Sequence, residues 1–393
     1  MTQTAYDAVI VGGGPAGATA ATELAKRGRN VVLLDRAGRI KPCGGAIPPR
    51  LIDEYQIADD LLVAKINCAR MVSPKGKHVD IHIKGGFVGM VDRDVFDEHL
   101  RNRAALCGAT RVTGRYDQFE RNSDGTVSVG YTVDGETQWL RTKTVIGADG
   151  ALSRVGKAVV PGADKLKYVF AYHEIVEAPE QADDRYGHER CDVIYNGGYS
   201  PDFYSWVFPH GKTASIGTGT AHKGFSLRGS IKDFREANGL QDLKTIRAEG
   251  APIPLEPLPR WDDGRNVLLA GDAAGVVAPS SGEGIYYAMT GGRIAAETID
   301  EFLTTANPKV LAKARKNFLR QHGNVFKVLD MMQRYWYIND SRRERFVKIC
   351  HDKDVQELTF DAYMNKELVK ARPLAHVRIF FKNIAHLTGL VPA

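Results

Sequence analysis

Three glycines near the N-terminus have the spacing of a phosphate-binding turn. Gly12, Gly14 and Gly17 form a GxGxxG pattern between an apolar strand expected over 6–11 and a helix expected over 16–27. The first glycine permits a tight turn, the second lets a pyrophosphate approach the backbone, and the third lets helix and strand pack closely. The unpaired N–H groups at the start of the helix then face the phosphates. The pattern predicts a dinucleotide site, and the alternative is a glycine turn without a ligand.

Acidic residues end two other apolar stretches. The strand expected over 31–34 is followed by Asp35, where a carboxylate can accept hydrogen bonds from a ribose. A strand after Asn266 ends at Asp272, and a helix is expected from about Gly284. An acidic strand end can bind ribityl hydroxyls, and a helix N-terminus aimed at a flavin stabilises its anionic reduced ring. These features favour FAD over NAD.

Together with TVIGADG at 144–150, these segments resemble the glutathione-reductase-like FAD superfamily, specifically its hydroxylase-fold branch. That branch contains monooxygenases, halogenases and reductases, so it does not by itself define the reaction. The resemblance implies that Arg93, at the start of DRDVFDEHL, contacts the flavin. The alternative for Arg93 is a solvated arginine in the first turn of a helix.

Two further stretches bear on the substrate. In RIKPCGGAIPPR, at 39–50, a Gly–Gly pair lets the backbone pass close to a ring system, and the prolines stiffen the loop. PDFYSWVFPHG, at 201–211, alternates as a strand does. Phe203, Ser205 and Val207 are expected on one side, and the opposite side would carry three aromatic residues, Tyr204, Trp206 and Phe208. These aromatics could line a long apolar cavity, or they could be ordinary core.

The segments KPCGGAIP, YxWxFPxG and GDAAGVVAPSSGEGI together resemble the geranylgeranyl reductase family. Through YWYINDSRRERFVKICHDKDVQ near the C-terminus, the whole chain is most similar to the branch of the (bacterio)chlorophyll pathway. The resemblance implies an FAD enzyme that uses NADPH to saturate three of the four double bonds of a geranylgeranyl chain, giving phytyl. The substrate would be geranylgeranylated (bacterio)chlorophyll, geranylgeranyl diphosphate, or both.

The resemblance also implies the site residues. Those expected to contact FAD are Gly12, Gly14, Ala16, Gly17, Asp35, Cys43, Gly44, Gly45, Ala46, Arg93, Asp272, Gly284 and Ile285. Tyr204, Trp206 and Phe208 match the prenyl-cavity pattern of the family. No metal site is expected.

An isolated alkene has no carbonyl to hold negative charge, so hydride delivery is expected to accompany protonation of the other carbon. Cys43 and Tyr204 are hypotheses for the proton donor, and a small buried structural thiol is the alternative for Cys43. One rival function is an FAD monooxygenase or halogenase acting on an apolar substrate. Another is a pigment-escort protein that holds flavin without catalysis.

The order of the segments predicts an α/β fold with a discontinuous FAD-binding Rossmann domain. That domain is expected at 1–67, 92–164 and 262–302. A β-rich substrate domain with an antiparallel sheet is expected at 68–91 and 165–261. The remaining segment, 303–393, is expected to be mainly helical. No second dinucleotide-binding unit is visible, so NADPH is expected to bind transiently.

The bulk composition, 43% hydrophobic and 25% charged, is that of a soluble globular protein. No signal peptide is visible, and five cysteines without a CxxC pair argue for a cytoplasmic setting without disulfides or zinc. The segment 309–393 carries 17 Lys and Arg against 8 Asp and Glu. Nucleic acid is not expected as a partner, because no binding motif accompanies this charge.

A helix expected near the C-terminus, at 373–390, is amphipathic. Its apolar arc contains Leu374, Val377, Phe380, Phe381 and Ile384, and Arg378, Lys382 and His386 lie opposite. This pattern fits peripheral contact with an anionic photosynthetic membrane. The alternative is packing on the body of the enzyme.

Overall fold

The computed structural model describes residues 5–357, apart from 37, 39, 84 and 85, together with 364 and 366. The chain forms two compact units, each assembled from three segments. Unit 1 contains Met1–Lys41, Arg93–Tyr168 and Ile253–Gly323, and unit 2 contains Pro42–Asp92, Val169–Pro252 and Asn324–Ala393. The amphipathic helix expected at 373–390 lies outside the described residues.

Unit 1 is built on a mixed seven-stranded sheet. Its parallel strands are β8 (Thr110–Thr113), β2 (Val31–Asp35), β1 (Tyr6–Val11), β11 (Glu136–Gly147) and β17 (Val267–Leu269). The antiparallel strands β10 (Val127–Val133) and β9 (Arg115–Arg121) extend the sheet from the first half of β11. Four residues of β1 are fully buried, from Ala8 to Val11, as expected for a central strand covered on both faces.

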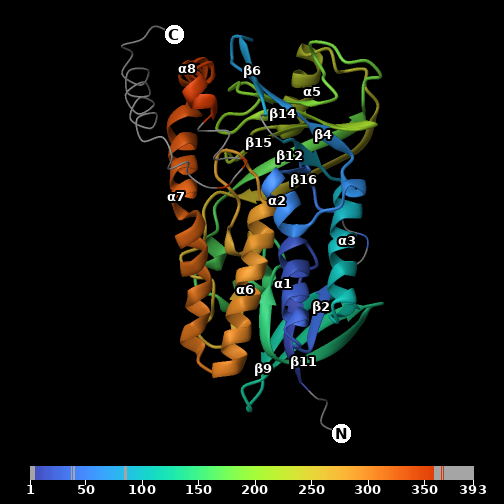
Figure 1. Ribbon diagram of the computed structural model, residues 1–393, viewed down its shortest axis with the longest axis vertical. Coiled ribbons are helices and arrows are strands. Elements are labelled where there is room, and N and C mark those ends of the chain that lie inside the picture. The colour runs from blue at the N-terminus through green and yellow to red at the C-terminus, as the bar shows by residue number, and fades with distance from the viewer. Residues whose placement is uncertain are drawn as a thin grey trace. The chain divides into compact units, whose positions relative to one another are not determined.

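Helices α1 (Pro15–Lys26) and α6 (Ile285–Thr305) pack against each other in unit 1 (Figure 1). The approach is close because α6 presents a glycine, Gly292, at which a Cβ would lie 2.2 Å from the carbonyl oxygen of Ala16. Helix α3 (Arg93–Leu106) also contacts α1. A short helix, α4 (Arg154–Val159), follows β11.

Unit 2 contains a seven-stranded sheet in the order β16-β12-β15-β14-β13-β5-β6. Its strands are β16 (Thr245–Pro254, whose last two residues belong to unit 1), β12 (Tyr168–Glu177, whose first residue does), β15 (Thr213–Thr220), β14 (Ser205–His210), β13 (Arg190–Ile194), β5 (Cys68–Val72) and β6 (His78–His82). The predicted antiparallel sheet is confirmed, with one parallel pair between β5 and β13.

Helix α5 (Leu227–Ala237) covers one face of this sheet. Its Ile231 and Phe234 pack with Val207 of β14 and Ile216 of β15 in one core cluster. Side chains alternate along a strand, so Trp206 and Phe208 point to the opposite face. A smaller sheet, β3 (Ala46–Ile47), β7 (Val88–Met90) and β4 (Ala64–Ile66), and helix α2 (Pro49–Tyr55) complete this part of unit 2.

The C-terminal part is helical where the structure describes it, as predicted. Helix α7 (Lys313–Trp336) begins in unit 1 and continues into unit 2, and α8 (Asp340–Ile349) follows. None of the helices in the described part of the chain combines the length and apolarity that crossing a bilayer demands.

Candidate functional site

The glycine turn of unit 1 connects β1 to α1. Gly12 has φ +106°, and a Cβ there would lie 2.4 Å from the carbonyl oxygen of Ala148. At Gly17 a Cβ would lie 1.8 Å from the carbonyl oxygen of Gly12. Gly14 differs, because open space surrounds its Cβ position at the N-terminus of α1. Packing within the protein therefore explains Gly12 and Gly17, whereas the space at Gly14 fits an approaching pyrophosphate.

Asp35 lies beside this turn at the end of β2. Arg101 of α3 connects Asp35 to the turn. Its Nη1 lies 3.3 Å from Asp35 Oδ2 and 3.2 Å from the carbonyl oxygen of Gly13. Burial raises the pKa of Asp35, and the amide of Gly13 and the charge of Arg101 oppose that rise. Sequence reasoning missed Arg101, because its role depends on α3 crossing the turn and no local motif marks it.

Asp272 belongs to a 3-10 turn, Gly271–Ala274, three residues after β17. Its buried carboxylate forms an ion pair with Lys41. A Cβ at Gly271 would lie 2.6 Å from the Cβ of Ala16, so the turn approaches the start of α1 closely. Gly284, the N-cap of α6, lies near the Asp272 carboxylate, with 3.8 Å between Oδ1 and a Cβ built at Gly284. Unit 1 therefore brings the predicted residues of α1, α6 and this turn together.

Arg93 is buried, so the alternative of a solvated arginine is wrong. Its guanidinium forms a bidentate pair with Asp97, one turn later in α3, with Nε–Oδ1 and Nη2–Oδ2 distances of 2.8 and 2.7 Å. This pairing neutralises a charge that burial would otherwise make costly.

The loop at Cys43–Ala46 lies in unit 2 and packs on β14. A Cβ at Gly44 would lie 3.1 Å from Cδ2 of Phe208. Gly45 has φ +71°, and a Cβ there would lie 2.5 Å from both Cε1 of His210 and the carbonyl oxygen of Val91. Contacts within the protein therefore require glycine at 45, whereas the contact at Gly44 is tight but involves a side chain that can move. His210 was not predicted as a site residue, although it stands in the PHG end of the aromatic strand.

Three aromatic rings form a row along β14 and the residue before it. The ring centroids of Tyr204 and Trp206 are 5.9 Å apart, and those of Trp206 and Phe208 are 6.1 Å apart. The predicted alternation fails at Phe203, because β14 begins only at Ser205 and Phe203 stacks on Tyr204 with centroids 4.2 Å apart. The planes of Tyr204 and Trp206 are inclined at 65° and those of Trp206 and Phe208 at 32°, so the row combines ring edges and ring faces.

Tyr204 is a poor acid in this setting. Burial raises its pKa well above its ordinary value of 10, so this phenol gives up its proton less readily than an exposed tyrosine does. It neighbours Tyr195, whose hydroxyl lies 3.3 Å from that of Tyr337. The Cys43 side chain is half-buried, and its Sγ accepts a hydrogen bond from the Gly45 N–H at 3.4 Å.

Arg343 of α8 ties the C-terminal motif to the start of the aromatic strand. Its side chain is buried and donates to the carbonyl oxygens of Ser200 and Tyr337, at 3.0 and 2.6 Å, and to Asp340. The segment YWYINDSRRER therefore has a structural role that its sequence did not reveal.

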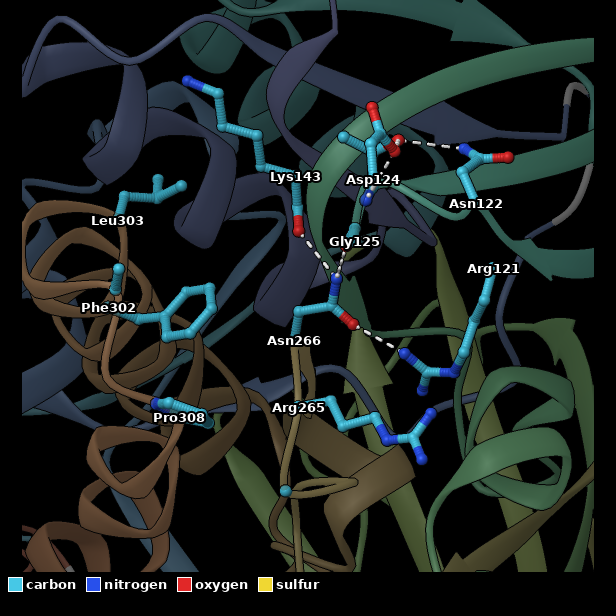
Figure 2. Close-up of a pocket in the computed structure, with 13 residues that line it drawn as sticks. Arg121, Asn122, Asp124, Gly125, Lys143, Arg265, Asn266, Phe302, Leu303 and Pro308 are labelled. Carbon is cyan, nitrogen blue, oxygen red and sulfur yellow. Dashed lines mark hydrogen bonds between the residues drawn. The ribbon is translucent and has the colours of Figure 1, made fainter.

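A separate hollow of about 520 Å³ in unit 1 is lined by the β9–β10 turn, Lys143 of β11, the residues just before β17 and the C-terminal end of α6 (Figure 2). Asn266 stands in its wall and is fully engaged: its Nδ2 donates to the carbonyl oxygens of Gly125 and Lys143, and its Oδ1 accepts from Arg121. None of the predicted site residues is among the described residues that line it. We interpret the hydrogen bonds of Asn266 as structural, because they connect the start of β17 to β9, to the β9–β10 turn and to β11.

All five cysteines are free thiols. Burial raises the pKa of Cys68 to about 11 and that of Cys350 to about 12, and it also raises the pKa of Cys191. Within the described ranges, no three His, Cys, Asp or Glu side chains are grouped to hold a metal ion.

The fold is shared with solved flavoenzymes. A geranylgeranyl bacteriochlorophyll reductase-like protein from Thermoplasma acidophilum superposes with a TM-score of 0.81 at 24% identity, over 94% of this chain and 99% of that one. A flavin-dependent brominase superposes with a TM-score of 0.76 at 17% identity, over 97% and 99% of the two chains. The predicted hydroxylase-type FAD fold is confirmed.

Sequence comparison is more specific. A family model described as an FAD binding domain matches residues 5–176. The geranylgeranyl diphosphate reductase of Rhodobacter capsulatus is 58% identical over 388 residues, 98% of each chain. That of Synechocystis sp. is 39% identical over 404 residues, 96% of this chain and 97% of the other. The chain is therefore a flavoprotein oxidoreductase that belongs to the geranylgeranyl diphosphate reductase family.

Proposed function

We propose that this enzyme reduces three of the four double bonds of a geranylgeranyl chain to give phytyl, with FAD and NADPH, in (bacterio)chlorophyll biosynthesis. The near-full-length identity to the Rhodobacter capsulatus enzyme carries the proposal. The substrate is geranylgeranyl diphosphate, as that enzyme's name indicates, or the geranylgeranyl ester of the pigment. A cytoplasmic location with peripheral contact at the photosynthetic membrane belongs to the same proposal.

Residues of unit 1 would hold the nucleotide part of FAD. Gly12, Gly14, Ala16 and Gly17 frame the start of α1, where backbone N–H groups and open space suit a pyrophosphate. Asp35 would accept hydrogen bonds from the ribose. The same proposal assigns ribityl and ring contacts to Arg93, Asp272, Gly284 and Ile285, and further ring contacts to Cys43, Gly44, Gly45 and Ala46.

The aromatic row would bind the prenyl chain. Tyr204 and Trp206 are almost fully covered by the protein itself, so this part of unit 2 is an apolar environment of the kind that a prenyl chain would enter. Each buried methylene contributes about 0.8 kcal/mol, so remote isoprene units can position one alkene for reaction. The π faces of Trp206 and Phe208 would also stabilise tertiary cationic character on the alkene.

Bound FAD, once reduced by NADPH, supplies hydride. The chain must then provide a proton for the other alkene carbon and keep water away from it. Cys43 and Tyr204 remain the candidate donors, and the raised pKa of Tyr204 favours Cys43. NADPH is proposed to bind transiently, because the described residues contain a single dinucleotide-type turn.

The test is anaerobic incubation of the purified flavoprotein with NADPH and each substrate, followed by mass analysis. Gains of two, four and six hydrogen atoms are expected. Oxygen-dependent product formation would instead indicate a monooxygenase or halogenase, and bound flavin that NADPH cannot reduce would indicate an escort protein. Trp206→Leu should slow turnover strongly, whereas Trp139→Leu, a substitution on the exposed part of β11, should not.

A further inference from the structure

We propose that His210 is a positioning residue, which fixes the Gly44–Gly45 peptide and thereby directs a backbone N–H at the sulfur of Cys43. The mechanistic meaning of this arrangement rests on the proposed function, because Cys43 is the favoured proton donor there. The arrangement itself is a property of unit 2 and can be tested without turnover.

His210 is the last residue of β14, and its side chain is 4% exposed. Its Nε2 lies 3.0 Å from the carbonyl oxygen of Gly44. A carbonyl oxygen only accepts hydrogen bonds, so Nε2 carries the hydrogen in this contact. The other ring nitrogen, Nδ1, lies 3.2 Å from Oδ1 of Asp92. The Nε2 contact therefore holds the loop, and Nδ1 faces the Asp92 carboxylate.

The hydrogen bond to Gly44 determines where the next N–H points. In a trans peptide the C=O and the N–H point in opposite directions, and the chain has no cis peptide among its described residues. With the Gly44 oxygen turned to His210, the N–H of Gly45 points away from His210. It meets Cys43 Sγ at 3.4 Å. The imidazole therefore acts on Cys43 through one rigid peptide plane.

This peptide has no side chain of its own to fix it. It stands between two glycines, which tolerate many backbone conformations, and Gly45 has φ +71°. The Val91 N–H donates to the Gly45 carbonyl oxygen at 2.9 Å. This bond fixes the peptide that follows Gly45. It does not fix the plane of the Gly44–Gly45 peptide, whose carbonyl oxygen contacts His210. Loss of the Nε2 donor should allow this plane to rotate.

Two amide substitutions separate the contacts of His210. The side-chain amide nitrogen of Gln reaches about as far as Nε2, and that of Asn about as far as Nδ1. His210→Gln can therefore still donate to Gly44, whereas His210→Asn loses this bond and can still reach Asp92. His210→Phe removes both contacts and keeps a planar ring.

The experiment measures iodoacetamide modification of Cys43 in the FAD-loaded protein at one fixed pH. After tryptic digestion, Cys43 is quantified in the peptide 40–50, and half-buried Cys107 in the peptide 104–111 serves as internal reference. An N–H donated to sulfur stabilises the reactive thiolate. We expect His210→Asn and His210→Phe to slow Cys43 relative to Cys107 by about threefold to tenfold, and His210→Gln to restore the rate.

Equal rates in the Gln and Asn variants, or faster modification in His210→Asn, would overturn the proposal. The Gln and Asn pair decides the matter even where His210→Phe fails to fold. If prenyl reduction is absent while the rates change as expected, the proposed function fails and the positioning role of His210 stands.

Discussion

Trp206 donates its indole N–H to the hydroxyl of Ser215, 3.0 Å away on the neighbouring strand β15. The same hydroxyl lies 2.9 Å from Nδ1 of His173, whose Nε2 faces Glu249 at 3.3 Å. Gly217, which pairs with Trp206, gives the indole its room, since a Cβ there would lie 2.1 Å from the ring. The indole is therefore fixed against the sheet by a hydrogen bond and by the absence of one side chain.

Removal of the Ser215 hydroxyl should release this ring. Ser215→Ala leaves the buried indole N–H without its acceptor, at a cost of about 1–3 kcal/mol in the free energy of unfolding. We also expect a several-fold loss in kcat/KM for the prenyl substrate. Ser205→Ala is the matched control, since Ser205 is equally buried and bonds Thr218 at 3.0 Å. It should lower stability without lowering kcat/KM, and equal kinetic losses in both variants would contradict the role of Ser215.

Two glycines of the N-terminal turn should respond differently to alanine. Gly17→Ala places a Cβ against the Gly12 carbonyl oxygen, so the FAD-free protein should unfold at a markedly lower temperature. Gly14→Ala meets no protein atom within 4 Å and has ordinary backbone angles, φ −74° and ψ −176°. We expect its FAD-free melting temperature to match the wild type and its FAD affinity to fall at least tenfold. Unchanged FAD binding in Gly14→Ala would place the pyrophosphate elsewhere.

Binding of FAD should depend on pH through Asp35. Ribose hydroxyls donate to the charged carboxylate, and burial raises the pKa of this group above its ordinary value. Affinity should therefore fall as the pH drops through the raised pKa, at a higher pH than an exposed aspartate would give. Asp35→Asn should bind weakly without this dependence, whereas Asp59→Asn, at a largely exposed carboxylate, should retain it. Fluorescence titration with FAD measures both.

The same shift has a consequence for folding. A raised pKa in the folded state means that Asp35 stabilises the fold at low pH and that this stability is lost as the pH rises through the folded-state pKa. In the absence of FAD, Asp35→Asn should therefore be more stable than the wild type near neutral pH. Urea unfolding at two pH values measures this difference.

Arg343 should matter far more than its neighbour in sequence. Arg343→Met fills a similar volume but leaves the buried carbonyl oxygens of Ser200 and Tyr337 without their donor. We expect a loss of about 3 kcal/mol or more in the free energy of unfolding. Arg342→Met removes only an exposed hydrogen bond to the Tyr335 carbonyl oxygen and should change stability by about 0.5 kcal/mol or less. Similar losses in the two variants would contradict the anchoring role.

Alanine substitutions at Gly45 and Gly76 separate the cost of steric contact from the cost of a positive φ. The two glycines have nearly equal φ, +71° and +76°. Gly76 has no neighbour within 4 Å of its Cβ position, so Gly76→Ala reports the backbone strain alone, about 1 kcal/mol. Gly45→Ala adds a contact of 2.5 Å with the Val91 carbonyl oxygen, which cannot rotate away as a side chain does. Its melting temperature should fall several degrees further, and equal shifts would show that the loop relaxes freely.

The elements predicted best are those whose signals are local. Helix α1 begins at Pro15 and β2 ends at Asp35 much as the glycine spacing and apolar runs indicated, because turn chemistry and periodicity act over a few residues. The row of Tyr204, Trp206 and Phe208 was likewise anticipated. Phe203 was not placed correctly, since the strand starts two residues later than the alternation suggested.

Contacts between distant segments could not be predicted in the same way. Arg101 meets Asp35 only because α3 packs on α1, and His210 meets Gly44 across 166 positions of sequence. Arg101 lies in no motif and His210 occupies an unspecified position of YxWxFPxG, so the sequence marks neither contact. The burial of Arg93 is made tolerable by its pair with Asp97, and this i,i+4 spacing is visible in the sequence.

The packing of α1 on α6 has a consequence for biosynthesis. About 260 residues separate the two helices, and ribosomes add roughly 5–20 residues per second, so α1 waits between about a quarter of a minute and a minute for its neighbour. During that time α1 lacks the partner on its α6-facing side, although α3, which also contacts α1, has already been made. The contact between α1 and α6 can therefore form only late in synthesis, after the strands and helices encoded between them have left the ribosome.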